Sequence, residues 1–115
     1  MVGEGSGFRI ECRIPGADCN PYFTFAGLLA AGLEGIEKKI EPTEQTKGDL
    51  YSLDGLQTVP TNLEQAVEKF KHSEFARSSF GQEVVEHYSH YFACEIDAFN
   101  AAVTDWERGR YFEHI

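Results

Sequence analysis

The chain has 115 residues, of which 42% are hydrophobic and 13% aromatic, and it carries a formal net charge of -9 at pH 7. This composition is typical of one globular domain and excludes an intrinsically disordered segment. The acidic balance makes nucleic acid and anionic membrane surfaces poor partners, because their phosphates repel it.

The first predicted element is a strand over residues 8–14. The run from Phe8 to Ile14 (FRIECRI) alternates apolar and polar residues over seven positions, as in a half-buried strand, and Pro15-Gly16 ends it. A strand has to pair, because a lone strand leaves its backbone hydrogen-bonding groups exposed. The sequence offers no second convincing strand. The partner is therefore expected from another chain or from the rest of a longer protein.

Helical periodicity and capping signals predict four helices after the strand, at about residues 20–39, 62–72, 82–102 and 104–112. Asn20-Pro21 is an N-cap followed by proline at the first helical position. Thr61–Glu64 and Thr104–Glu107 both match the capping-box pattern, and residues 73–80 add one or two helical turns. We therefore expect a mostly helical segment with one short strand.

The three cysteines are Cys12, Cys19 and Cys94. An odd number without a C-x-x-C pair argues against a disulfide framework and against a zinc ribbon. Free thiols persist in a reducing compartment, so the cytoplasm is the expected location. Residues 1–20 lack the apolar stretch of a secretory signal, and the most apolar window, 22–36, is too short and polar to span a bilayer.

The polar face of the predicted strand carries Arg9, Glu11 and Arg13. Alternate residues on a strand lie roughly 6.6 Å apart, so two guanidinium groups flank one carboxylate. Arginines bind phosphate or carboxylate bidentately, and a carboxylate among them can hold a divalent metal that bridges phosphates. The pattern fits a nucleotide-phosphate or acyl-phosphate site. It equally fits a solvated, salt-bridged strand face, which is the more common case.

Two other features carry less functional weight. Glu83, His87, His90 and Cys94 share one helix face at three- and four-residue spacings, which can suit zinc. No companion cluster is evident elsewhere, so we expect a partly exposed polar face. Trp106 is expected to be a packing anchor rather than a residue that stacks on a ligand.

Several segments together resemble the C-terminal signature of glutamine synthetases. They are Arg9–Pro15 (RIECRIP), Ala17–Tyr22 (ADCNPY) and Ala30–Ile36 (AAGLEGI). The similarity continues through Leu63–Ala66 (LEQA) and Val103–Glu107 (VTDWE), so it covers nearly the whole chain.

By this resemblance, residues 1–115 are the C-terminal segment of an α+β catalytic domain, and the strand lies in its active site. Such enzymes use ATP to convert glutamate to γ-glutamyl phosphate, which ammonia or an amine then attacks, and they need magnesium or manganese. The resemblance implies that Glu11 is a metal ligand and that Arg9 contacts the nucleotide phosphates. It implies that Arg13 contacts glutamate and the transferred phosphoryl group. It also implies a homo-oligomer that acts in nitrogen metabolism.

The departures from the family pattern limit these expectations. The other metal ligands, the ammonium-site acid and the small N-terminal domain lie upstream of this signature in the family, and only eight residues precede Arg9. The chain alone is therefore expected to be inactive. The alternative is a non-catalytic truncated remnant or fragment that acts by self-association or by association with full-length subunits.

Two details concern the subfamily. The form Arg13–Asp18 (RIPGAD), with the late Trp106-Glu107, resembles the branch that joins glutamate to amines. Tyr51 is similar in place to a tyrosine that some bacterial members nucleotidylate, but its flanking residues differ, so ordinary surface packing is expected.

Overall fold

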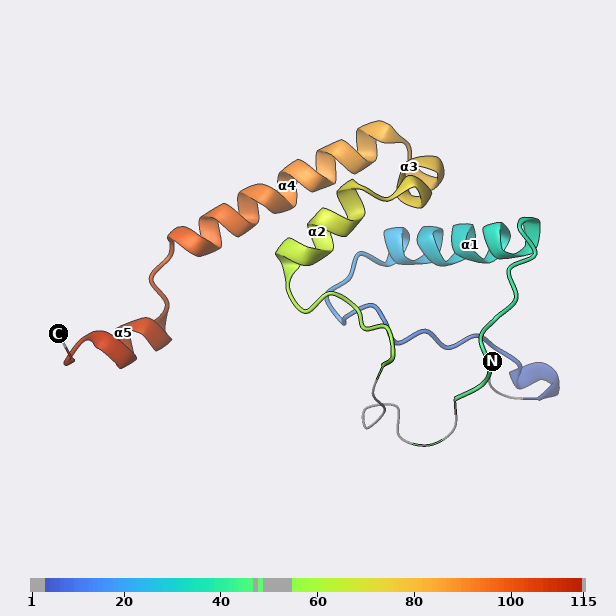
Figure 1. The fold of residues 1–115 in the computed structure, drawn as a ribbon, viewed down its shortest axis with the longest axis horizontal. Helices are drawn as coiled ribbons and strands as arrows, with labels where there is room; N and C mark the ends of the chain where they lie inside the picture. The colour runs from blue at the N-terminus through green and yellow to red at the C-terminus, as the bar shows by residue number, and fades with distance from the viewer. Residues whose placement is uncertain (1–3, 47, 49–54, 115) are drawn as a thin grey trace. The chain divides into compact units, whose positions relative to one another are not determined.

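Helices make up most of the structure, a computed structural model that describes residues 4–46, 48 and 55–114 (Figure 1). The described elements are the 3₁₀ turn η1 (Gly5–Gly7) and the helices α1 (Pro21–Glu37), α2 (Leu63–Lys71), α3 (Glu74–Phe80), α4 (Gln82–Ala101) and α5 (Asp105–Tyr111). They belong to two units, Met1–Val59 and Pro60–Ile115. The mostly helical character is confirmed, and the four expected helices lie within two residues of their expected ranges. Over the residues described, no helix is both long and apolar enough to cross a membrane.

Helix α1 of the first unit has local signals at both ends. The side-chain oxygen of Asn20 accepts a hydrogen bond from the backbone N–H of Tyr22 (3.0 Å), and Pro21 occupies the first position, where no N–H is needed. At the other end Lys39 adopts a φ of 50°, and the N–H of Ile40 donates back into the last turn at 2.9 Å. The local contacts of Asn20 thus fix the start of α1, and the segment with the candidate site residues lies before it.

The strand predicted over residues 8–14 is not formed in the part of the chain that the structure describes. The segment is not helical, and only Arg9 makes an isolated backbone bridge. The physical reason is that no strand among the described residues pairs the backbone N–H and C=O groups along the length of this segment. Phe8, Ile10 and Ile14, whose side chains were expected on a buried face, are each at least 61% exposed.

In the second unit α2 and α3 pack against the long helix α4 (Figure 1). The side chains buried there are small: Ala76 of α3, together with Val85 and Ser89 of α4. Gly81 joins α3 to α4 with a φ of 89°, a conformation that side chains disfavour, so the turn depends on glycine. The unit therefore has a narrow core that lies along one side of α4.

The two predicted capping boxes are realised differently. At α5 the hydroxyl of Thr104 accepts a hydrogen bond from the N–H of Glu107 (3.2 Å), and the Glu107 carboxylate accepts one from the N–H of Thr104 (2.8 Å), as predicted. At α2 the N-cap lies one residue later than predicted. The Asn62 side chain accepts from the N–H of Gln65 (2.9 Å), and the Gln65 side chain accepts from the N–H of Thr61 (3.3 Å). Asparagine caps at least as well as threonine, which explains the shift.

Apolar side chains remain uncovered in both units, and Phe112 is the extreme case at 87% exposed. The accessible surface is 10730 Å². A folded monomer of this mass exposes about 6,300 Å², and two separate domains of half the mass together expose about 7,600 Å². Large exposed apolar patches mark surfaces that other protein covers. The accessible surface is therefore larger than that of a folded monomer or of two separate domains of this mass.

The core of the second unit can be tested at Val85, which is 1% exposed. Val85→Ala removes two methyl groups and leaves a gap, so the free energy of unfolding of this unit should fall by about 2 kcal/mol. Thermal unfolding followed by circular dichroism measures the loss. The control Val103→Ala changes a 71% exposed valine and should cost less than about 0.5 kcal/mol. Equal losses from the two variants would contradict this core.

The capping box of α5 predicts a pH dependence. Hydrogen bonds from the backbone N–H of Thr104 and then from its hydroxyl lower the pKa of Glu107. Because this pKa is lower in the folded state, the stabilisation is present above the unfolded pKa and is lost as the pH falls through the folded pKa. We therefore expect α5 to fray on acidification.

Thr104→Ala should raise the pKa of Glu107 toward its ordinary value, and Thr61→Ala, the control at α2, should leave it unchanged. An NMR titration of the Glu107 side-chain carbon measures both. A Glu107 pKa that does not respond to Thr104→Ala would refute the contribution of the Thr104 hydroxyl, since the backbone N–H remains in the variant.

Candidate functional site

The three side chains singled out on the predicted strand lie together before α1. The Glu11 carboxylate accepts a hydrogen bond from Nε of Arg13 (2.6 Å) and lies 2.5 Å from Nη2 of the same guanidinium. On its other side, Nη2 of Arg9 lies 3.9 Å from Oε2 of Glu11, and Nη1 of Arg9 donates to the carbonyl of Gly7 (3.2 Å). The carboxylate therefore lies between two guanidinium groups, as the alternating pattern predicted.

These groups are open to water. The Arg13 side chain is 87% exposed and that of Glu11 is 38% exposed. An exposed ion pair contributes roughly 0–1 kcal/mol, because water and salt screen the attraction and the side chains lose freedom. The cluster is thus held together weakly, and either partner can exchange its contact for a ligand. Chemically, two planar forks of N–H donors suit phosphate or carboxylate oxygens, and the carboxylate suits a hard cation.

A complete metal site is absent from the part of the chain that the structure describes, where no three His, Cys, Asp or Glu side chains gather. Glu11 offers one carboxylate in reach of the two arginines. Magnesium needs six oxygen ligands at near-octahedral positions, several of them commonly waters. The Glu11 carboxylate is therefore a donor of the type that magnesium prefers, but one carboxylate supplies only a small part of the six ligands.

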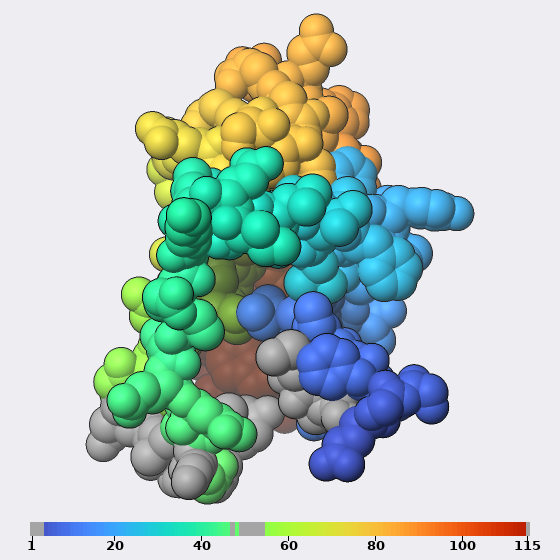
Figure 2. Space-filling view, turned by 90° about the vertical axis from the view of Figure 1, so that its right-hand side faces the viewer, coloured from blue at the N-terminus to red at the C-terminus, as the bar shows by residue number. Residues whose placement is uncertain are grey.

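An apolar groove of about 860 Å³ adjoins this cluster within the first unit. One wall is formed by residues from the segment 10–19, Glu11 among them, and the other by one face of α1 with Phe25, Leu29 and Leu33. In the space-filling view α1 is the cyan and teal band, and the blue segment that precedes it lies beside it (Figure 2). The candidate site residues and the groove are thus parts of one surface.

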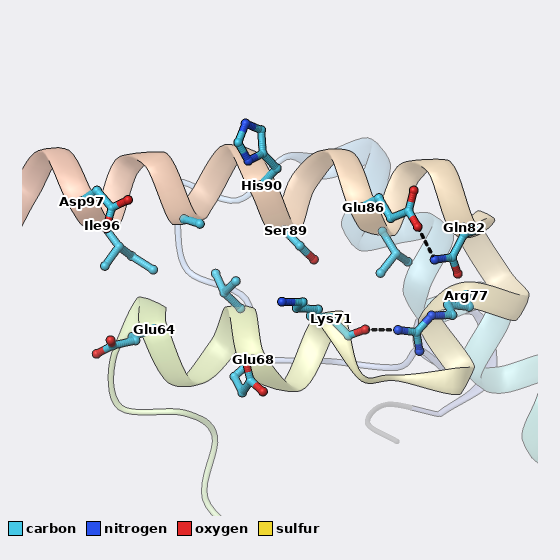
Figure 3. Close-up of a pocket in the computed structure, with 13 residues that line it drawn as sticks. Glu64, Glu68, Lys71, Arg77, Gln82, Glu86, Ser89, His90, Ile96 and Asp97 are labelled. Carbon is cyan, nitrogen blue, oxygen red and sulfur yellow. Dashed lines mark hydrogen bonds between the residues drawn. The ribbon is translucent and has the colours of Figure 1, made fainter.

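A second groove, of about 520 Å³, lies between α2 and α4 of the second unit (Figure 3). Charged side chains of both signs line it, and several are already engaged. Nε2 of Gln82 donates to the Glu86 carboxylate (2.6 Å), and Arg77 donates to the backbone carbonyl of Lys71. Mixed charges with internal pairing are typical of a solvated helix surface. This groove therefore shows no chemistry of its own.

Ser89, which the sequence did not single out, lies at the same groove. It is buried, and its hydroxyl has no hydrogen-bond partner among the described residues. Its oxygen points toward the space between α2 and α4 (Figure 3). A buried unpaired hydroxyl costs about 1–3 kcal/mol. The signal that could have found it is a serine four residues after Val85, on the buried side of a helix.

The other residues that the sequence analysis singled out form no further candidate site among the described residues. On α4, Sγ of Cys94 lies 3.8 Å from Nε2 of His90, and the His87 ring packs edge-on against Tyr88 with centroids 5.2 Å apart. Trp106 is mostly exposed, with its ring edge-on to Tyr111 at a centroid separation of 6.2 Å. Tyr51 lies outside the described residues.

Comparison with known families gives one match that covers most of the chain. Residues 1–111 match the family model described as glutamine synthetase, catalytic domain. The match includes Arg9, Glu11 and Arg13.

Individual relatives agree with the family match. A gamma-glutamylethanolamide synthetase of Streptomyces coelicolor is 49% identical over 115 residues, which are 100% of this chain and 25% of that protein. A glutamate–isopropylamine ligase of a Pseudomonas species is 42% identical over 117 residues, covering 100% of this chain and 26% of that protein. A glutamine synthetase of Methanosarcina mazei is 40% identical over 119 residues, which cover 97% of this chain and 27% of that protein. The chain therefore spans about a quarter of the length of the curated relatives it matches.

The weak pairing in the cluster predicts that its residues can be removed without loss of fold. Glu11→Ala or Arg13→Ala should change the free energy of unfolding of the first unit by less than about 1 kcal/mol, because the pairs are exposed. Urea titration followed by circular dichroism measures this. Asn20→Ala is the positive control, because it removes the cap of α1 and should cost about 1 kcal/mol or more. A loss at Glu11 larger than that at Asn20 would show a structural role.

Proposed function

The chain belongs to the glutamine synthetase family, and we propose that it supplies part of the active site of an ATP-dependent glutamate–ammonia or glutamate–amine ligase. The observation that carries the proposal is the cluster of Arg9, Glu11 and Arg13, which lies inside the matched catalytic-domain region. Its side chains are exposed, next to one another and weakly paired, as groups that bind an anionic ligand have to be. The relatives that match are ligases of this kind by name.

The proposed reaction has two steps. First, a γ-carboxylate oxygen of glutamate attacks the terminal phosphorus of ATP, the bond to ADP breaks, and γ-glutamyl phosphate forms. Ammonia or an amine then attacks the acyl carbon, phosphate leaves with the electron pair of the broken C–O bond, and a proton leaves the nitrogen. Negative charge gathers on the transferred phosphoryl group in the first step, and fixed cations stabilise it there.

Each residue of the cluster has a proposed role. Arg13, the most exposed of the three side chains, contacts glutamate and the phosphoryl group, where its planar fork binds two oxygens at once. Arg9 contacts the nucleotide phosphates. For these contacts Arg13 has to release or share its hydrogen bond to Glu11. The free-energy cost of that exchange is small, because the exposed pair contributes roughly 0–1 kcal/mol.

The proposed cofactors are ATP and magnesium or manganese. The Glu11 carboxylate is a hard oxygen donor between two phosphate-binding side chains, so its chemistry fits one ligand of such a cation. When bound, the cation supplies positive charge at the phosphate oxygens. The remaining ligands have to come from protein beyond this segment, because the described residues gather no complete set.

For the acceptor we favour an amine over ammonia. Two matched relatives are named for ethanolamide and isopropylamine chemistry, at 49% and 42% identity, and a glutamine synthetase follows at 40%. The segment Arg13–Asp18 also resembles the amine branch. We further propose that the intact enzyme is a cytoplasmic homo-oligomer. What supports this is that the three cysteines of this segment are free and that its total accessible surface exceeds that of a lone domain of the same mass.

The proposal predicts a rate loss in a complete ligase that contains this segment. Arg13→Ala should lower ATP-dependent phosphate release by about 10²- to 10³-fold, because a positive charge facing the transition state is lost. Arg13→Lys should restore only part of the rate, because a point charge replaces the fork. Glu11→Ala should raise the concentration of metal–ATP needed for half-maximal rate. The 115-residue chain by itself should show no turnover, because one carboxylate and two arginines cannot position all reactants.

Arg108→Ala is the matched control, since Arg108 is an exposed arginine of α5 whose Nη1 lies 3.8 Å from the carboxylate of Asp105. It should leave the rate within about twofold of the unchanged enzyme. Near-normal turnover of both the Glu11 and the Arg13 alanine variants would refute the placing of this cluster in the active site. Glutamate-dependent turnover by the isolated chain would refute its expected inactivity.

A further inference from the structure

The groove between α2 and α4 has no reactive cluster, but its lining is suited to hold a small molecule. Its volume of about 520 Å³ falls within the range of pockets that bind small ligands. Apolar side chains from both helices line it together with the charged ones, and that of Ile96 points into the space between the helices (Figure 3). The apolar lining residues are Val67, Val85, Ala93 and Ile96. They suit the hydrocarbon part of a ligand.

Two hydrogen-bonding groups, one from each helix, face the same space. Ser89 of α4 is 7% exposed, and its hydroxyl has no hydrogen-bond partner among the described residues. Its oxygen points toward α2, and the side-chain nitrogen of Lys71 on α2 lies between the two helices in the same view (Figure 3). A hydroxyl and an ammonium group both donate hydrogen bonds, so together they suit an oxygen acceptor.

The charges around the groove limit which acceptor it can hold. Among the described residues that line it, the cationic side chains are those of Lys71 and Arg77, and the carboxylates outnumber them. Because negative charge is in excess, a phosphate or a nucleotide with two or more negative charges is repelled. One carboxylate group beside Lys71 is instead neutralised by a single charge-assisted contact. The carboxylate-bearing lining residues are Glu64, Glu68, Glu86 and Asp97.

We propose that the groove between α2 and α4 is a binding site for a small aliphatic monocarboxylate. The ligand's carboxylate accepts hydrogen bonds from the Ser89 hydroxyl and from the Lys71 ammonium group, and its hydrocarbon chain lies against Val67 and Ile96. Binding gives the buried Ser89 hydroxyl a partner, so it stabilises the second unit. All of these residues belong to that unit, and the proposal does not depend on the ligase function proposed above.

The test uses the full 115-residue chain and hexanoate as the probe. Hexanoate should shift the amide NMR signals of the groove residues in a saturable manner, and it should raise the thermal midpoint of the second unit. Hexylamine has the same chain length and the opposite charge, so it should do neither. Inorganic phosphate should also fail to bind, because it has no hydrocarbon part and carries more negative charge.

Ser89→Ala separates binding from folding. It should weaken hexanoate binding about tenfold, because a hydrogen bond to a charged group is lost. The same change should raise the thermal midpoint of the unliganded chain, because a buried unpaired hydroxyl is removed. Ser78→Ala is the matched control, since Ser78 is an exposed serine of α3 outside the groove lining whose hydroxyl donates to the carbonyl of Phe75 (3.0 Å). It should leave binding within about twofold.

Lys71→Met tests the ammonium group, because it keeps an unbranched apolar side chain and removes the charge. It should also weaken hexanoate binding about tenfold. Lys69→Met is its matched control, since Lys69 lies on the same helix and outside the lining of this groove. Binding by that variant should stay within about twofold of the unchanged chain.

The proposal is overturned if hexanoate gives no saturable shift, if hexylamine or phosphate binds as well as hexanoate, or if either variant of the site binds like its matched control. A thermal midpoint that Ser89→Ala leaves unchanged or lowers would also contradict it, because the hydroxyl would then already have a partner. Tight binding by hexanoate that both site variants weaken, with a more stable unliganded Ser89→Ala chain, supports it.

Discussion

Phe25, Leu29 and Leu33 give α1 an apolar stripe that meets water where a folded domain places a second layer of structure. Burial of such side chains is the main favourable term in folding, and it has to offset the conformational entropy of every ordered residue. The second unit meets the same difficulty, since its most deeply buried side chains, such as Val85 and Ala76, are small. The segment has well-formed helices and too little buried surface around them. Most of its other properties follow from this imbalance.

The exposure of the candidate site is one consequence of this small buried surface. Arg9, Glu11 and Arg13 pair with one another in open solvent, where each contact is weak. The same groups become strong electrostatic partners only when water is excluded and their positions are held, because screening then falls. A covering layer over the adjoining groove would supply both conditions. The groove and the cluster proposed for catalysis therefore share one solvent-exposed surface, with Glu11 common to both.

Local signals determined the helices well. Asn20 and Thr104 cap α1 and α5 through their own side chains, and the lengths of these helices follow from contacts within a few residues. The contact of Glu11 with both arginines was predictable for the same reason, because residues two apart in a non-helical segment can face the same side. At α2 two neighbouring residues, Thr61 and Asn62, both suit the N-cap position, and the pattern alone did not decide between them.

The sequence by itself thus determined the helix positions, the grouping of the three site residues and the family, because each is encoded in local spacing or in an extended run of matching residues. Only the tertiary structure decided that residues 8–14 form no strand among the described residues, that the α1 stripe lines a groove beside Glu11, and that Ser89 is buried with no hydrogen-bond partner in that part of the chain. These features depend on which surfaces meet and which do not. Strand pairing and burial are relations between distant segments, and alternation or periodicity within one segment cannot say whether its partner is present.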